Sequence, residues 1–237
     1  MKKKLFRKDV EPIGAELGIF FTDDLGDLKD EVGLTLDDMY CLRNVKNREL
    51  WLTGEINDMM AEDILTEIRE YNRQDYLNAI PPQKRIPIKL FIDSPGGDVV
   101  AGLSIIDTIK ASETPVWTIN FSKAYSMAFH VLINGDKRFA FKSSSFLLHD
   151  GSEGGFDSSS KFRDRLKFND SLEGITRQNV IERTKITPRE YEMNARREWY
   201  MLVPEAKELG VVDQVIERLG EVLTLKPPVQ KLDAIFK

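Results

Sequence analysis

Short apolar runs alternate with apolar residues at helical spacing through the middle of the chain. Ile88–Ile92 is a run typical of a strand, and it is followed at helical intervals by Val99, Leu103, Ile106 and Ile109. The first pattern predicts a strand and the second predicts a helix with one apolar face. The Gly-Gly pair between them predicts a tight turn.

The same alternation occurs upstream. Leu50–Thr53 predicts a short strand, and the helix after it is predicted by Met60, Ile64, Ile68 and Tyr71. Strands that alternate with helices of this length imply right-handed crossovers and a largely parallel sheet. The fold class expected from the pattern is therefore α/β.

Downstream, the alternation continues through a second strand and a second helix. Val116–Ile119 predicts the strand, and Ala124–Val131 has the apolar spacing of the start of a helix. Two further strands are predicted at Arg138–Ala140 and Phe146–Leu148.

The last third of the chain begins with the Gly/Ser-rich stretch Gly151–Ser160, which we expect to be flexible. A long amphipathic helix through Phe162–Ile175 follows. Thr187, with proline after it and glutamate three residues on, predicts a capped helix start. Pro204–Gly210 predicts a short helix stopped by glycine, leading into a strand at Val211–Val212.

We expect three regions along the chain. Residues 1–47 are mixed and acidic in the middle, and they form an N-terminal extension. Residues 48–220 form the main domain, in which the proline-containing segment 73–86 is a loop. Residues 221–237 form a C-terminal tail.

The composition excludes several classes of protein. The chain has 237 residues and a formal net charge of -5, with cations and anions interspersed. This pattern argues against a nucleic-acid partner, because phosphate binding needs clustered Lys and Arg. One cysteine, Cys41, and two histidines exclude a disulfide framework and a Cys/His zinc site. We expect no metal and no cofactor.

The N-terminus does not predict a targeting segment. Residues 1–8 are basic, but no apolar core follows them and acidic residues interrupt a transit-peptide pattern. No run approaches the ~20 apolar residues that span a bilayer. We therefore expect a cytoplasmic protein that does not enter the membrane.

Three features offer chemistry. Ser126 follows a predicted strand and opens a predicted helix, where a sharp turn exposes a nucleophile or where the hydroxyl simply caps the helix. His149 ends a predicted strand and is a candidate base, whereas His130 lies one helical turn after Ser126, where packing or surface exposure is expected. Gly96 and Gly97 form either a tight connection or a backbone donor site for an oxyanion.

Five segments, all in the same order, resemble the ClpP family, the proteolytic subunits of the ATP-dependent Clp protease. They are Ser94–Gly102, Ala124–Ala128, Lys137–Phe139, Leu148–His149 and Pro204–Asp213. The resemblance runs from about Leu50 to about Ile216. It implies a crotonase/ClpP-like β-α superhelix with a long handle helix. In the family this helix and the strand before it form the handle that joins two rings, which here corresponds to Gly151 through about Arg183.

The resemblance also implies roles for individual residues. Ser126 corresponds to the family nucleophile and His149 to its general base, while the backbone N–H groups of Gly97 and Met127 correspond to its oxyanion hole. The family usually has aspartate as the third triad member. Counting back from the Pro-Glu-Ala segment gives Glu198 at that position, as a triad acid or as a solvated surface carboxylate.

A serine endopeptidase that cleaves unfolded polypeptides is the function that the resemblance implies. Its assembly would be a homo-oligomer of two stacked heptameric rings, and an AAA+ ATPase unfoldase would feed it. Two alternatives stay open: a phage-type head-maturation protease, suggested by the N-terminal extension, and a catalytically poor structural ring subunit, suggested by Glu198 and by the bulky Tyr125 beside the serine.

Overall fold

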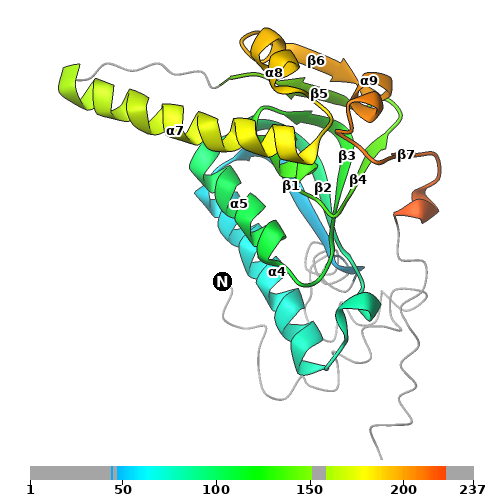
Figure 1. The fold of residues 1–237 in the computed structure, drawn as a ribbon. Helices are drawn as coiled ribbons and strands as arrows, with labels where there is room; N and C mark the ends of the chain where they lie inside the picture. The colour runs from blue at the N-terminus through cyan, green and yellow to red at the C-terminus, as the bar shows by residue number, and fades with distance from the viewer. Residues whose placement is uncertain (1–43, 45–46, 151–158, 223–237) are drawn as a thin grey trace, which may run out of the picture. The chain divides into compact units, whose positions relative to one another are not determined.

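The computed structural model describes residues 44, 47–150 and 159–222 (Figure 1). From Arg48 onward the described residues belong to one compact unit. Most of the predicted extension, the Gly/Ser-rich stretch up to residue 158 and the tail after residue 222 lie outside the described residues. The strand expected before the handle helix falls on that omitted stretch.

The strands of this unit form one sheet. In the described part of the chain they are β1 (Glu49–Ile56), β2 (Ile88–Gly97), β3 (Val116–Tyr125), β4 (Lys137–Phe141), β5 (Ser145–Leu148), β6 (Trp199–Leu202) and β7 (Gln214–Ile216). The order is β1-β2-β3-β4-β7, and β5 branches from the end of β3 to pair with β6. The β5–β6 pair is antiparallel and the other pairs are parallel. The predicted α/β class with a largely parallel sheet is confirmed.

Helices connect the strands. They are α4 (Asp58–Leu77), α5 (Val99–Ala111), α6 (Met127–Ile133), α7 (Ser159–Arg183), α8 (Pro188–Asn194) and α9 (Val203–Glu208), with 3₁₀ turns at Pro82–Lys84 and Leu219–Glu221. In Figure 1, α4 and α5 run side by side along one face of the sheet. The described residues contain no helix that is long and apolar enough to cross a membrane.

The main core lies between the sheet and the helices α4, α5 and α6. Ile64 and Ile68 of α4 pack in it together with Ile105 and Ile106 of α5. Helix α6 is buried at all seven of its positions. Because Ser126 directly precedes α6, the core fixes the backbone on the carboxyl side of this serine.

A second apolar cluster covers the other face of the sheet. It contains the buried residues Phe91, Ile119, Phe139, Ile216 and Val222. On the same face the rings of Trp51 and Phe91 stack, with their centroids 4.7 Å apart. The central strands are therefore apolar on both faces, as expected for a parallel sheet.

The structure differs from the sequence analysis at three elements. Helix α4 continues to Leu77, so the loop predicted at 73–86 begins after it. The strand predicted at Val211–Val212 is wrong: both valines are buried in the core, and the ladder with β4 starts at Gln214. Strand β6 was not predicted, because its four residues precede a proline-containing helix start.

The capping predictions are confirmed. Thr187 accepts a hydrogen bond from the Glu190 N–H, and the Glu190 carboxylate accepts one from the Thr187 N–H. This reciprocal pair satisfies two backbone donors at the start of α8. Helix α9 ends before Gly210, which has φ 69°.

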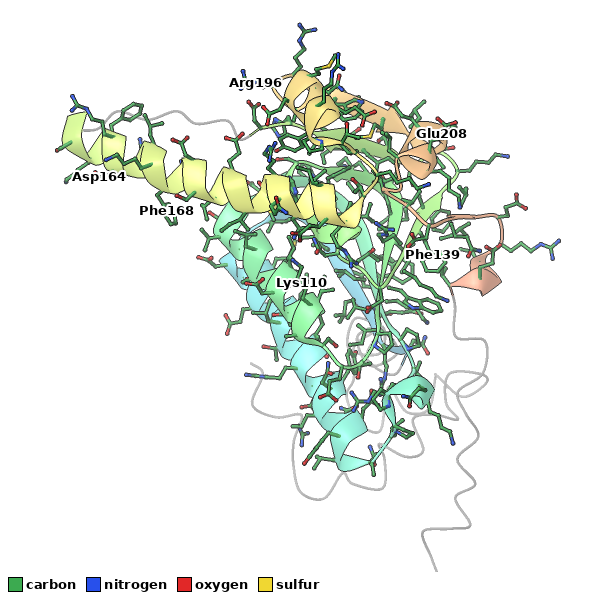
Figure 2. All side chains as sticks on the ribbon, viewed as in Figure 1. Lys110, Phe139, Asp164, Phe168, Arg196 and Glu208 are labelled. Carbon is green, nitrogen blue, oxygen red and sulfur yellow. The ribbon has the colours of Figure 1, made fainter. Side chains whose placement is uncertain are left out.

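Helix α7 differs from its predicted amphipathic form. Its carboxyl-terminal part packs on the domain through Thr176, Asn179 and Val180, but most of the rest is exposed. Phe162 and Phe168 lie about 120° apart around the axis at 100° per residue, so the exposed apolar residues form two stripes rather than one face. Figure 2 shows the Phe168 side chain projecting from the helix.

Candidate active site

Ser126 lies at a strained turn between β3 and α6. Its backbone has φ 52° and ψ -123°, a conformation that is costly for a residue with a side chain. Its N–H donates to the carbonyl oxygen of Leu147 on β5 at 2.9 Å. The turn is thus held from both sides, by the neighbouring strand and by the buried helix that follows.

Gly96 lies directly against this turn. A Cβ atom at Gly96 would lie 2.7 Å from Ser126 Cβ and 2.9 Å from the backbone nitrogen of Met127. The residue also has φ 98°, so glycine is required there by space and by conformation. Its absent side chain leaves the backbone nitrogen of Met127 uncovered on this side.

The two predicted oxyanion donors, the N–H groups of Gly97 and Met127, are both close to Gly96: Gly97 follows it in the chain, and a Cβ atom at Gly96 would lie 2.9 Å from the Met127 nitrogen. Met127 is the first residue of α6, where a backbone N–H has no acceptor within the helix. The N–H of Gly96 is occupied by Ser94 Oγ at 3.0 Å, whereas Gly97 is paired opposite Ile56 at the end of β2. The N–H of Met127, at the positive end of the α6 dipole, favours negative charge beside Ser126.

The half-buried His149 follows the last residue of β5. Strands β3 and β5 are parallel, with Tyr125 paired to Leu147, so Ser126 and His149 leave the sheet at the same edge. The other histidine, His130, is buried in α6. Burial, followed by the nearby charge of His149, lowers the pKa of His130 to about 4. His130 is therefore neutral and enclosed.

Glu198 precedes the first residue of β6. The antiparallel register pairs Leu148 with Trp199. Glu198 therefore lies across from His149, one residue beyond the end of the β5–β6 ladder. The side chain of Glu198 is exposed, and its Oε2 accepts a hydrogen bond from Tyr200 Oη at 3.1 Å.

Asp150, the other acidic residue near His149, belongs to a different environment. Its N–H donates to the Ala195 carbonyl at 2.7 Å. Burial, followed by the charge of Asp150, raises the pKa of Glu173 on α7. Asp150 therefore interacts electrostatically with Glu173 of α7.

The predicted residues Ser126, His149 and Glu198 thus lie at one edge of the sheet, where parallel strands end and where sites in such sheets form. Among the residues that the structure describes, Ser126, His149 and Glu198 form no hydrogen bond or ion pair with one another. The described residues also include no group of three or more His, Cys, Asp or Glu side chains placed to hold a metal ion.

Two aromatic residues beside the site were not assigned a role in it from sequence. Tyr125 and Tyr200 make an edge-to-face contact with ring centroids 5.8 Å apart. Tyr125 was noted only as a bulky neighbour of the serine. The hydrogen bond between Tyr200 and Glu198 could not be predicted without β6, because it is extended backbone that places residues two apart on one face.

The structure is thus an α/β protein with a mostly parallel sheet, in which a strained serine turn lies against a glycine turn. The family model of the Clp protease matches residues 35–219. The chain belongs to the Clp protease family, and its fold is consistent with the ClpP-like fold. The family assignment supports a ClpP-type peptidase.

Proposed function

We propose that this chain is a serine endopeptidase of ClpP type that hydrolyses peptide bonds of unfolded polypeptides inside a ring-shaped oligomer. The observation that supports it most is the Ser126 turn, which has positive φ at the start of a buried helix and has Gly96 packed against it. Strained backbone of this kind is concentrated at functional sites.

The proposed reaction is acyl transfer. Ser126 Oγ attacks the scissile carbonyl carbon while His149 takes the hydroxyl proton, and the N–H groups of Gly97 and Met127 hold the oxyanion. His149 then gives the proton to the leaving amine as the peptide C–N bond breaks. Water hydrolyses the acyl-enzyme by the same steps and regenerates the serine.

Glu198 is the proposed third member of the triad. A carboxylate beside the imidazole orients the ring and stabilises the imidazolium formed during proton transfer. The hydrogen bonds of a catalytic triad are often loose without substrate and tighten in the complex. We propose that substrate binding or ring assembly aligns Ser126, His149 and Glu198.

Helix α7 supports the proposed assembly. Phe162, Leu166, Phe168 and Ile175 are exposed along it, and apolar surface of this kind marks interaction sites. Two apolar stripes give the helix two surfaces on which other copies of the chain could pack. Two stacked heptameric rings, fed by an AAA+ ATPase unfoldase, are the assembly that family membership suggests.

Labelling with a fluorophosphonate probe tests the nucleophile. The wild-type chain should be labelled and should cleave a fluorogenic peptide. Ser126→Ala should lose labelling and about four orders of magnitude of turnover, with its oligomeric state unchanged. An unlabelled wild-type chain would instead indicate the catalytically poor structural subunit.

Size-exclusion chromatography with light scattering tests the assembly. We expect a large homo-oligomer with cyclic symmetry, and we expect charged substitutions at Phe168 and Ile175 to reduce its size. A stable monomer at micromolar concentration would contradict the proposal.

A further inference from the structure

Three neighbouring strands place Tyr125, Leu147 and Tyr200 in one row beside the candidate site. Tyr125 on β3 is paired with Leu147 on β5, and Leu147 is paired with Tyr200 on β6. Side chains at paired positions share a face of the sheet. The edge-to-face contact of the two tyrosine rings, at an interplanar angle of 82°, follows from this register.

The hydroxyl groups of the two tyrosines have different partners. Tyr125 Oη is 2.8 Å from Ser145 Oγ, while Tyr200 Oη donates to Glu198 Oε2 at 3.1 Å. The hydrogen bond to Glu198 raises the pKa of Tyr200. Tyr200 therefore stays protonated near neutral pH and remains a donor to the carboxylate.

A glutamate in this position needs such a partner more than an aspartate does. Glutamate has one more rotatable bond, and it loses more rotamer freedom when it is fixed. Glu198 is exposed, so packing restrains it little. A hydrogen bond to Oε2 restricts the side chain and leaves Oε1 to accept from an imidazole.

We propose that Tyr200 is a positioning residue that holds Glu198 by Oε2, so that Oε1 is available to orient His149. The edge-to-face contact with Tyr125 restrains the exposed Tyr200 ring, and it connects the acid to β3, the strand that ends directly before the proposed nucleophile. This inference rests on the proposed function, because it gives Tyr200 a role in the same triad.

Steady-state kinetics of Tyr200→Phe test the proposal. The variant keeps the ring and removes only the hydroxyl. We expect kcat to fall about tenfold with KM unchanged, because a hydrogen bond to a charged group that acts in the transition state is lost. Tyr76→Phe is the matched control: Tyr76 is exposed on α4, and its variant should keep wild-type kinetics.

Double variants separate positioning from a structural role. In the Glu198→Ala background, Tyr200→Phe should change kcat by less than about twofold, because residues that act through one another are not additive. The same small effect is expected in the Glu198→Asp background, because the shorter acid needs less restraint. A signal independent of turnover is the pKa of Tyr200, which should fall in Glu198→Ala.

Several results would overturn the inference. Wild-type kcat in Tyr200→Phe would show that the hydroxyl has no role, and an increased kcat would show that Tyr200 holds Glu198 away from His149. An equal loss in the Glu198→Ala background would show a structural role. An unlabelled and inactive wild-type chain would refute the proposed function itself, and with it this role for Tyr200.

Discussion

Helix α6 and strand β6 border the same candidate site in contrasting environments. Every residue of α6 is buried, and the turn before it is held by a backbone hydrogen bond from Ser126 to Leu147. Within the part of the chain that the structure describes, strand β6 pairs with β5 alone, and two of its four residues are exposed. The proposed nucleophile is thus fixed by backbone and core, and the proposed acid by a side-chain hydrogen bond.

This difference indicates where the site tolerates change. A buried turn that depends on a close glycine has little freedom to adjust, because protein interiors are close-packed. An exposed carboxylate can be longer by a methylene or change its rotamer without disturbing the core. A glutamate at position 198 is therefore compatible with the fold, whereas a side chain at position 96 is not.

Gly96→Ala should have a larger effect on turnover than the two other test variants below, Glu198→Gln and His130→Phe. The new Cβ would meet Ser126 Cβ and the Tyr125 carbonyl oxygen, both at 2.7 Å, so the turn must move. We expect turnover to fall about 10³-fold, since small displacements of reacting groups are costly. Peptide cleavage and probe labelling would measure it.

Gly54→Ala is the matched control for backbone strain. Gly54 has φ 84°, close to the 98° of Gly96, but a Cβ there meets nothing within 4 Å. This variant should lose about 1–2 kcal/mol of stability and keep its turnover. Equal losses of turnover in both variants would contradict a specific role for the Gly96 contact.

Glu198→Gln should have a smaller effect, about 10²-fold in kcat/KM. The imidazolium formed in catalysis loses its counter-charge, but water screens an exposed carboxylate more than a buried one. Glu208→Gln, at an exposed glutamate of α9 that Figure 2 labels, serves as the control. Wild-type turnover in Glu198→Gln would make Glu198 a surface carboxylate only.

The parts of the fold predicted from sequence are those in which local pattern and tertiary packing agree. The apolar run Ile88–Ile92 is followed by a helix with one apolar face, and Thr187 begins a capping box. Strand β2 and the helices α5 and α8 were therefore predicted correctly. Val211–Val212 was misassigned because buried valines favour a strand by propensity, although these two fill the core without pairing.

For the site, sequence could predict which residues lie at one edge of the sheet but not how their side chains pair. Ser126 and His149 each follow a strand, and parallel strands end at one edge, so their proximity follows from topology. The bond between Tyr200 and Glu198 depends on strand β6. That strand was not predicted, because its four residues show no apolar/polar alternation and stand directly before a proline-containing helix start.

His130→Phe should have the smallest effect on turnover. It tests whether a buried side chain of α6 takes part in catalysis. The Nδ1 atom of His130 is buried with no hydrogen-bond partner among the described residues. Replacing an unpaired buried polar ring with an apolar one is close to neutral or stabilising. We therefore expect turnover within about twofold of wild type, as required if His149 rather than His130 is the base.

The same variant should change how stability depends on pH. Burial lowers the pKa of His130 from 6.5 to about 4. As the pH falls through this window the unfolded chain takes up a proton that the folded chain does not, so the wild type loses stability. The loss from this residue reaches at most about 3 kcal/mol below pH 4. Urea unfolding across the window should show a flatter dependence in His130→Phe. An unchanged dependence would mean that His130 is hydrated, and that α6 is less tightly packed than its burial implies.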